Sequence, residues 1–425
     1  MNMRGAKPGE KSRRGRRANA RANGHRSVFS LGFRGNVVGE PEGVLQLRIH
    51  SDPDILVSSH NSLDAAQVNV FSHLGFIRAW WKAYGKGKTL HVVEAVDSLT
   101  NSVVIAPFYS SPEHPTRWML IGDRRADYCD VASVGMIGNC GKQLYSAITR
   151  LPGWWDIAID KIPVESPLLY AASWAYGPNA SIRAKVRAWT VRRGPLAYIH
   201  WHERHPRIEQ RRILELRGLL AEQSHRKHVN WFLRRGKLEY RRITVPEEVL
   251  HRLPAFFALH VNEWHTKGGR SLFDDASNRN FYRFLIDELG SQGAIRLDTV
   301  ELSGRIIAAH FGFEWRERAF YYKPCYDPEF ASHSPGKLLL AYIIEDAANR
   351  GLEEVDLLYG LEPYKLRYAS SVRATASLLL QRSRIRAAAK RIRGVARALA
   401  VSKSTQAMER LESAKPSAGY GQDAK

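Results

Sequence analysis

The sequence predicts an α/β fold of two related units, each a mixed, largely antiparallel sheet flanked by helices. The chain has 425 residues, 44% of them apolar, which is enough for two domains of ordinary size. Segments with alternating apolar residues are interspersed with segments of helical period. The order of these segments in the first half returns in the second, so we expect duplication of one α/β unit.

Three pairs of matching segments make up this internal repeat, and they occur in the same order in both halves. Each half also has a Gly-Lys helix that leads into a strand bearing aspartate, Asp156 or Asp160 in the first half and Asp356 in the second. The matching segments are residues 81–85 with 264–268, residues 91–109 with 296–313, and residues 141–144 with 336–339.

Charge and composition divide the chain into four regions. Residues 1–40 are predicted to be a disordered basic arm, 41–205 the first unit, 206–381 the second unit, and 382–425 a basic tail. The net charge of +22 lies mostly in the tails: residues 1–27 carry nine Lys or Arg against one acid, and residues 382–425 carry eleven against three. We therefore do not expect the folded body to bind nucleic acid.

The first unit is predicted from short apolar runs bounded by turn residues. A helical pattern ends in the aromatic segment 80–84, and a second helix precedes the strand that bears Asp156 and Asp160. The predicted elements are strand 44–49, helix 64–84, strands 91–96, 103–109 and 117–121, helix 142–150, strand 155–160, a short helix, and strand 186–191.

A long, basic helix over residues 207–235 is predicted to join the units. Two helices follow, the first broken or restarted at Pro254, and Ser303-Gly304 is a hairpin turn. The other predicted elements are strand 237–245, helices 246–265 and 278–289, strands 295–302, 305–314 and 318–325, a helix that ends at Arg350-Gly351, strand 355–360, and closing strand 373–380.

The helix after residue 333 begins with Ser334-Pro335-Gly336-Lys337-Leu338. Ser334 is a candidate N-cap, and proline suits the first helical position because the missing N–H costs nothing there. A helix start with small residues and one lysine can bind phosphate oxygens. A Walker loop is not supported, because Ala331 and Leu338 occupy the places of its first glycine and its Ser or Thr.

The cysteines and histidines predict no metal site and no disulfide framework. Three cysteines have no close pair, and the histidines of residues 200–228 lie in an arginine-rich region without the customary ligand spacing. No run of about 18 apolar residues occurs. We expect a cytoplasmic protein, with peripheral contact at the inner face of the membrane as an open alternative.

One set of residues in the second half matches the pattern of a known family in order. They are Leu259, His260, Trp264, Gly304, Ile307, Ala308, Ala309, Tyr326, Asp327, Pro328, Ser334 to Lys337, Gly351, Asp356, Gly360, Tyr364 and Lys365. On these residues the second half closely resembles the CelD-type acyltransferases, a branch of the GNAT acetyltransferase superfamily linked to cellulose and exopolysaccharide production and related to the Fem-type transferases. The resemblance implies two GNAT-like units, the first degenerate, and acetyl-CoA or another acyl-CoA as donor. It implies that the pyrophosphate rests on the helix start at residues 334–338, although the superfamily's usual glycine loop is absent.

Acyl transfer from a thioester needs an oriented acceptor and a base that removes its proton. It also needs a hydrogen-bond donor that stabilises the oxyanion and an acid that protonates the thiolate. Asp356 and Glu362 are the predicted general bases, and Tyr326 and Tyr364 the groups that protonate the thiolate or hold the acceptor. An N–H of strand 320–325 is expected to stabilise the oxyanion. His260, Trp264 and Lys365 are the predicted substrate-binding residues. A structural role remains the alternative for Asp356, Tyr326, Tyr364 and Lys365.

The leading hypothesis is an acyl-CoA-dependent N- or O-acyltransferase acting on a sugar, a polysaccharide precursor or a related small molecule. One alternative uses aminoacyl-tRNA as donor, as Fem-type enzymes do. The other is a non-enzymatic scaffold or nucleic-acid-binding protein that acts through its basic tails. Residues 383–401 form a basic amphipathic pattern that suits either an anionic membrane surface or a solvated helix.

Overall fold

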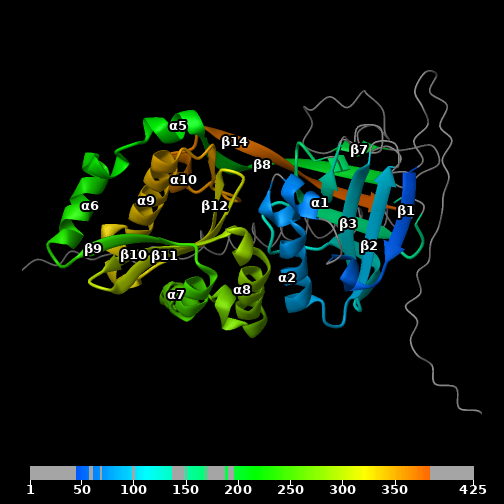
Figure 1. The fold of residues 1–425 in the computed structure, drawn as a ribbon, viewed down its shortest axis with the longest axis horizontal. Coiled ribbons are helices and arrows are strands. Elements are labelled where there is room, and N and C mark those ends of the chain that lie inside the picture. The colour runs from blue at the N-terminus through cyan, green and yellow to red at the C-terminus, as the bar shows by residue number, and fades with distance from the viewer. Residues whose placement is uncertain are drawn as a thin grey trace, which may run out of the picture.

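One continuous mixed sheet runs through the molecule, with helices on both of its faces (Figure 1). The strand order is β1-β2-β3-β4-β6-β14-β8-β13-β12-β11-β10-β9, with β5 beside β3 and β7 beside β8. The predicted α/β fold of two units is confirmed. The computed structural model describes residues 45–56, 61–67, 69–97, 101–135, 148, 151–166, 168–169, 187–189 and 196–382.

The first unit has antiparallel strands β1 to β4, with helix α2 packed against them. The helix predicted over residues 64–84 is divided, because Asn69 caps a separate 3-10 turn and His73 then caps α2. The elements are β1 (Leu45–His50), η1 (Pro53–Leu56), α1 (Asn61–Ala66), η2 (Val70–Ser72), α2 (Leu74–Tyr84), β2 (Thr89–Asp97), β3 (Ser102–Ser111), β4 (His114–Leu120), β5 (Ala132–Val134), β6 (Asp156–Pro163) and β7 (Arg187–Trp189).

The second unit has helices α7 and α8 on one face of its strands and α9 and α10 on the other (Figure 1). Strands β8 and β14 link it to the first unit. The elements are β8 (Leu196–Glu209), α5 (Gln210–Glu215), η3 (Leu219–Ala221), α6 (Gln223–Leu233), β9 (Leu238–Ile243), α7 (Pro246–Thr266), η4 (Leu272–Asp274), α8 (Ala276–Leu289), η5 (Gly290–Gln292), β10 (Ile295–Leu302), β11 (Arg305–Trp315), β12 (Arg318–Tyr326), η6 (Pro328–His333), α9 (Pro335–Arg350), β13 (Glu354–Asp356), α10 (Pro363–Leu366) and β14 (Ser371–Gln381).

Two short parallel strand pairs occupy corresponding places in the two units. In the first unit β4 pairs with β6 only from Arg117 to Met119, and in the second β12 pairs with β13 only from Arg318 to Phe320. Every other strand pairing among the described residues is antiparallel. Each parallel pair therefore separates after three residues, which supports the predicted duplication.

Three local predictions are wrong. The single basic helix of residues 207–235 does not exist: Glu209 still belongs to β8, and Gly218, at φ +85°, ends the helical turn that follows α5. Pro254 does not break α7, where burial of the neighbouring apolar side chains offsets the lost hydrogen bond. The strand predicted over 355–360 is only β13, because Leu358 takes φ +58°.

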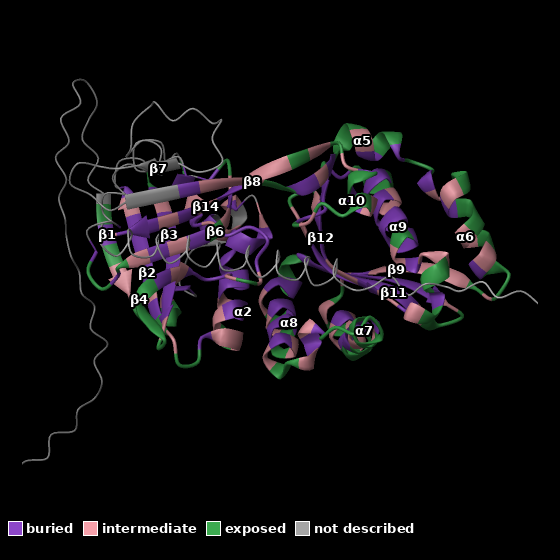
Figure 2. Ribbon diagram, turned by 180° about the vertical axis from the view of Figure 1, so that it is seen from behind, coloured by how far each residue is buried: buried purple, intermediate pink, exposed green. Residues whose placement is uncertain are grey.

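A buried charge network holds α9 on the sheet. Arg296 of β10 is fully buried and donates to Asp298 at 2.7 Å, to Glu314 at 3.1 Å and to Asp346 of α9 at 3.2 Å. His310 accepts the N–H of Tyr322 with Nε2 at 2.9 Å, at the point where β11 and β12 shift register. The ion pair to Asp346 holds the C-terminal half of α9, and the apolar face of the helix is buried against the sheet (Figure 2).

The two units meet at a second buried network centred on Arg373 of β14. Its guanidinium contacts Asp356 Oδ2 at 2.7 Å and both carboxylate oxygens of Glu354 at 3.0 Å. Tyr128 of the first unit donates its hydroxyl to the same Asp356 oxygen at 2.7 Å. A charge buried here without its partner would be costly, so Arg373 couples the packing of the two units.

We predict that Arg373→Met lowers the free energy of unfolding by about 3–5 kcal/mol, because Asp356 then remains buried without a counter-ion, whereas Glu354 keeps Arg207 at 3.3 Å. Chemical denaturation measures the loss. Arg211→Met is the matched control: the Arg211 side chain is 93% exposed and pairs with Glu215 on the surface, so its loss is expected to cost about 1 kcal/mol or less. Equal effects of the two variants would contradict the role of Arg373.

His205 is a buried histidine at the same junction. Its Nε2 lies 2.9 Å from the carbonyl oxygen of Asp127 and therefore donates to it, while Nδ1 has no partner among the described residues. Burial lowers the pKa of His205 from 6.5 to about 4. In the unfolded chain the ring binds a proton near pH 6.5, whereas in the folded protein it does so only near pH 4. Stability due to His205 is therefore present above pH 6.5 and is lost as the pH falls.

We predict that this group alone makes the wild type about 2 kcal/mol less stable at pH 5 than at pH 8. His205→Gln keeps a donor for Asp127 but cannot be protonated, so its loss of stability between pH 8 and pH 5 is smaller by that amount. Urea denaturation of both proteins at the two pH values measures the difference. Parallel pH dependences of wild type and variant would refute the prediction.

Candidate functional site

A cavity of about 500 Å³ lies at the start of α9, between α6 and α10. Ser334, Lys337, Leu338 and Tyr364, four of the residues predicted from the sequence, line it. The rest of the lining was not in the predicted site: Ser224, His225, Lys227, His228, Pro363, Arg367 and Tyr368.

The lining carries positive charge and no carboxylate. Lys227 and Lys337 form no ion pair with any described residue, and Arg367 donates to Ser224 Oγ at 3.2 Å. Burial, and then the charge of Arg367, lower the pKa of His225. Three cations without counter-ions in a concave site favour an anionic ligand with more than one negative charge.

At the start of α9, which borders this cavity, one backbone N–H has no partner among the described residues. Ser334 is the N-cap residue but sits at φ 52° and makes no side-chain cap bond, so the expected capping bond is absent. The N–H groups of Lys337 and Leu338 both bond to the carbonyl oxygen of Ser334 at 3.1 Å, and Pro335 has no N–H. Gly336 is left without a capping partner among the described residues, as a helix start suited to phosphate requires.

Pro335 and Gly336 do not line the cavity themselves. Gly336 packs against Tyr326, since a Cβ at this position would lie 3.3 Å from the ring carbon Cδ1. The backbone N–H of Tyr326 bonds to Glu263 at 3.0 Å, and Lys267 lies 4.8 Å from the ring. Tyr326 therefore supports the first turn of α9 from the side.

Tyr364 and Glu362 lie together at the start of α10. Glu362 is half exposed and pairs with Lys365 at 3.1 Å. Burial, and then the charges of Glu362 and Glu263, raise the pKa of Tyr364, so its hydroxyl keeps its proton at neutral pH. Tyr364 can thus donate a proton at the cavity wall, and Glu362 has an accessible carboxylate beside it.

Asp356 lies away from this cavity lining, in the network of Arg373. It is fully buried and accepts bonds from Tyr128, Arg373 and the N–H of Leu358. Burial raises the pKa of Asp356 to about 6, against the opposing charge of Arg373. These contacts favour the structural alternative that the sequence left open for this residue.

His260 and Trp264 are on α7, which covers the opposite face of the sheet from α9 (Figure 1). Burial lowers the pKa of His260 to about 4, and its Nδ1 lies 2.9 Å from Ser271 Oγ. Trp264 stacks on His260 at 6.0 Å and is 45% exposed. The structure therefore does not bring these two predicted substrate-binding residues to the cavity at α9.

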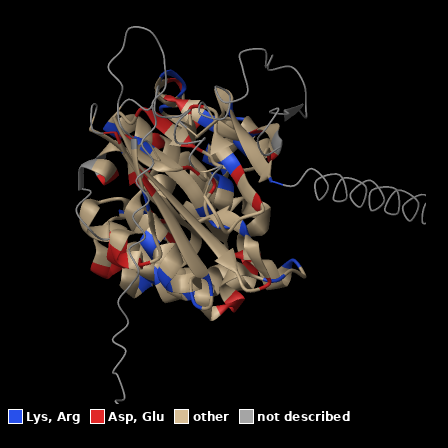
Figure 3. Ribbon diagram, turned by 90° about the vertical axis from the view of Figure 1, so that its right-hand side faces the viewer, with Lys and Arg blue, Asp and Glu red and all other residues tan. Residues whose placement is uncertain are grey.

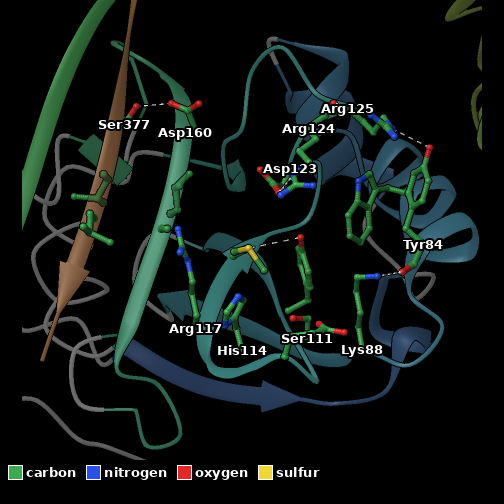
Figure 4. A pocket seen from close by; sticks show the side chains of 18 of the residues that line it. Tyr84, Lys88, Ser111, His114, Arg117, Asp123, Arg124, Arg125, Asp160 and Ser377 are labelled. Carbon is green, nitrogen blue, oxygen red and sulfur yellow. Dashed lines mark hydrogen bonds and ion pairs between the residues drawn. The ribbon is translucent and has the colours of Figure 1, made fainter. Parts of the chain in front are cut away.

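A second cavity, of about 880 Å³, lies in the first unit where β4 and β6 separate (Figure 4). Asp160 accepts a bond from Ser377 on one side, and Arg125 meets Tyr84 on the other. Acidic and basic side chains alternate around it, including Glu113, Asp123, Asp160, Lys88, Arg117 and Arg124. This mixed lining, unlike that at α9, does not favour one sign of ligand charge.

Neither a metal site nor a membrane-spanning helix occurs in the part of the chain that the structure describes. His225 and His228, two of the histidines considered for a metal, instead line the cavity at α9. Lys or Arg and Asp or Glu are interspersed over the described elements (Figure 3). The basic arm of residues 1–40 and all of the tail after Arg382, including residues 383–401, lie outside the described residues.

Residues 221–366 match the family model described as an acetyltransferase (GNAT) domain. The match supports an acyltransferase. It covers about a third of the chain and contains every residue of the cavity at α9 except Arg367 and Tyr368. The GNAT-type segment thus coincides with the cationic cavity, and the first unit lies outside the match.

The comparison with curated proteins gives no match. Among solved structures, a conserved protein of unknown function from Bacteroides thetaiotaomicron is 13% identical, with a TM-score of 0.45, covering 78% of this chain and 97% of that one. FemX is 11% identical, with a TM-score of 0.48, covering 75% and 94%. A tandem GNAT protein from the clavulanic acid biosynthesis pathway is 12% identical, with a TM-score of 0.37, covering 79% and 98%. Similarity at this level carries no argument about activity.

We predict that inorganic pyrophosphate binds at the start of α9 and that Lys227→Gln and Lys337→Gln each weaken this binding about tenfold, because each removes one charge-assisted contact. Isothermal titration calorimetry at constant ionic strength measures the affinity. Lys86→Gln, which removes an exposed cation far from α9 in the sequence, is the control and should bind as the wild type does. Equal affinities of all four proteins would exclude the assignment.

Proposed function

We propose that the protein is an acyl-CoA-dependent acyltransferase of the CelD type that acylates a sugar, a polysaccharide precursor or a related metabolite. The observation that carries this proposal is the cavity at the start of α9, which is lined by three cations and by no carboxylate. CoA carries a pyrophosphate and a further phosphate, which such a lining suits. The GNAT-type match of residues 221–366 supports the same reaction class.

The proposed reaction is a direct transfer. The nitrogen or oxygen of the acceptor attacks the thioester carbonyl carbon, the C–S bond breaks, and the sulfur leaves as a thiolate. Tyr364 lines the cavity with a protonated hydroxyl and is the proposed donor of a proton to this thiolate. The proton of the acceptor goes to a carboxylate, and of the two predicted bases the geometry favours Glu362, which is half exposed, over the fully buried Asp356.

The oxyanion is proposed to meet an N–H of β12 beyond Phe320, where the strand leaves β13. The N–H of Tyr322 is taken by His310, so it is not this donor. Lys227, Lys337 and Arg367 are proposed to hold the phosphates of CoA. Lys365 remains the proposed contact to an acidic part of the acceptor.

The donor is tested by incubating the full-length protein with acetyl-CoA or with aminoacyl-tRNA, each with a panel of amino sugars and sugar phosphates. Release of free CoA thiol, dependent on an acceptor, is the expected result. Transfer only from aminoacyl-tRNA would favour the Fem-type alternative. No binding of CoA and no transfer from either donor would refute the proposal.

We predict that Tyr364→Phe lowers the rate of thiol release about a hundredfold or more while the Kd for acetyl-CoA stays within about twofold of wild type, because the hydroxyl acts on the leaving group. Tyr368→Phe is the matched control, since it removes a hydroxyl from the same cavity that instead meets His225 at 2.9 Å. Equal rates for the two variants would remove Tyr364 from the mechanism.

A further inference from the structure

Cations from both units converge on Tyr359, directly after the carboxyl end of β13. Lys161 of the first unit lies 5.3 Å from the ring centroid, and Arg204 of β8 donates to the phenol oxygen at 2.7 Å. Lys365 of α10 donates to the carbonyl oxygen of Tyr359 at 2.9 Å. Tyr359 itself is 42% exposed, so this set of cations reaches the protein surface.

Lys323 of β12 lies within electrostatic range of this group, because, besides burial, the charges of Lys161 and Lys365 lower its pKa. It lies three residues beyond Phe320, the last residue of β12 that pairs with β13, and its Nζ is 4.2 Å from the ring of Tyr322. No hydrogen bond or ion pair to its ammonium occurs among the described residues. Burial lowers the pKa of Lys323; the charges of Lys161 and Lys365 lower it further, and Asp127 opposes them.

The charges in this group are not balanced. Asp127 pairs with Lys161 at 3.4 Å, and Glu362 pairs with Lys365 at 3.1 Å. Arg204 and Lys323 have no carboxylate within ion-pair distance in the described part of the chain. Gathering like charges without counter-ions opposes folding, and the arrangement is therefore more readily explained by an anion that binds between them.

The position of the group fits a substrate site. In open α/β sheets ligands bind outside the carboxyl ends of the strands, and the group lies at the carboxyl ends of β12 and β13, where the two strands part. Glu362, the favoured base, contacts one member of the group, Lys365. The phosphate-binding cavity at α9 is lined by other cations, Lys227, Lys337 and Arg367, so the two sets do not share a charge.

We propose that Lys161, Arg204, Lys323 and Lys365 bind an anionic group of the acceptor, and hence that the acyl acceptor is a phosphorylated or carboxylated sugar rather than a neutral one. The inference deepens the proposed function and rests on it. Two cations come from the second unit, one from the first and one from the connecting strand β8, so the acceptor site is complete only when both units are in place. This assigns the first unit a part in substrate binding.

The test titrates the full-length protein with glucose 1-phosphate, glucuronate and neutral glucose in isothermal titration calorimetry, at constant ionic strength and with saturating CoA to occupy the cavity at α9. At least one charged probe should bind, and glucose should not; which of the two binds more tightly distinguishes phosphate from carboxylate. Lys323→Gln and Arg204→Gln should each weaken that binding about tenfold. Lys86→Gln, at an exposed turn, should not.

Thermal unfolding without ligand distinguishes a structural role of these cations from a role in binding the acceptor. Because Lys323 and Arg204 lack counter-ions, each Gln variant should unfold at the same temperature as wild type or higher. Charged probes that bind no better than glucose, or that bind the variants as they bind wild type, would overturn the proposal.

The Kd of CoA is measured in every protein. A wild type that does not bind CoA refutes the proposed donor, and the response of the probes to Lys323→Gln still decides the anion site.

Discussion

The ion pair between Arg373 and Asp356 is the interaction on which the arrangement of the two units depends. Arg373 is on β14, which pairs with β6 of the first unit along one edge and with β8 along the other. Asp356 ends β13, and Tyr128 reaches the same carboxylate from the first unit. One buried carboxylate thus ties β13 to β14, 17 residues further along the chain, and to Tyr128 of the first unit, and Arg373 compensates its charge.

That junction lies next to the separation of β12 and β13, so the same contacts that join the units also shape the site. Asp356 is the last residue of β13 to pair with β12, and its Oδ1 accepts the N–H of Leu358 at 2.8 Å. The chain then turns through Leu358 and Gly360, both at positive φ, towards Glu362 and Tyr364. A carboxylate that seemed suited to catalysis therefore holds the turn that presents the catalytic candidates.

Sequence patterns were sufficient for the β10–β11 hairpin and for α9, because these depend on turn residues, helical period and a proline that are local in the chain. Sequence patterns wrongly predicted one continuous helix over residues 207–235. Basic and apolar residues there follow a helical spacing, yet Glu209 pairs in a strand and Gly218 adopts a left-handed conformation. Pairing of β8 with β13 and β14 outweighs local propensity, and such pairing is invisible in a single segment.

Periodicity and residue type act over a few neighbouring positions, so they were enough to predict the α/β class and the duplicated order of elements. Phosphate binding at the helix start stays a prediction. The tertiary structure alone decided which cations lack partners. Lys227 and Arg367 join Lys337 around one cavity. Lys161, which pairs with Asp127, and Arg204, which has no carboxylate partner among the described residues, meet at Tyr359. Whether a charge is paired depends on distances between side chains that are remote in the chain, and only the folded sheet brings those side chains together.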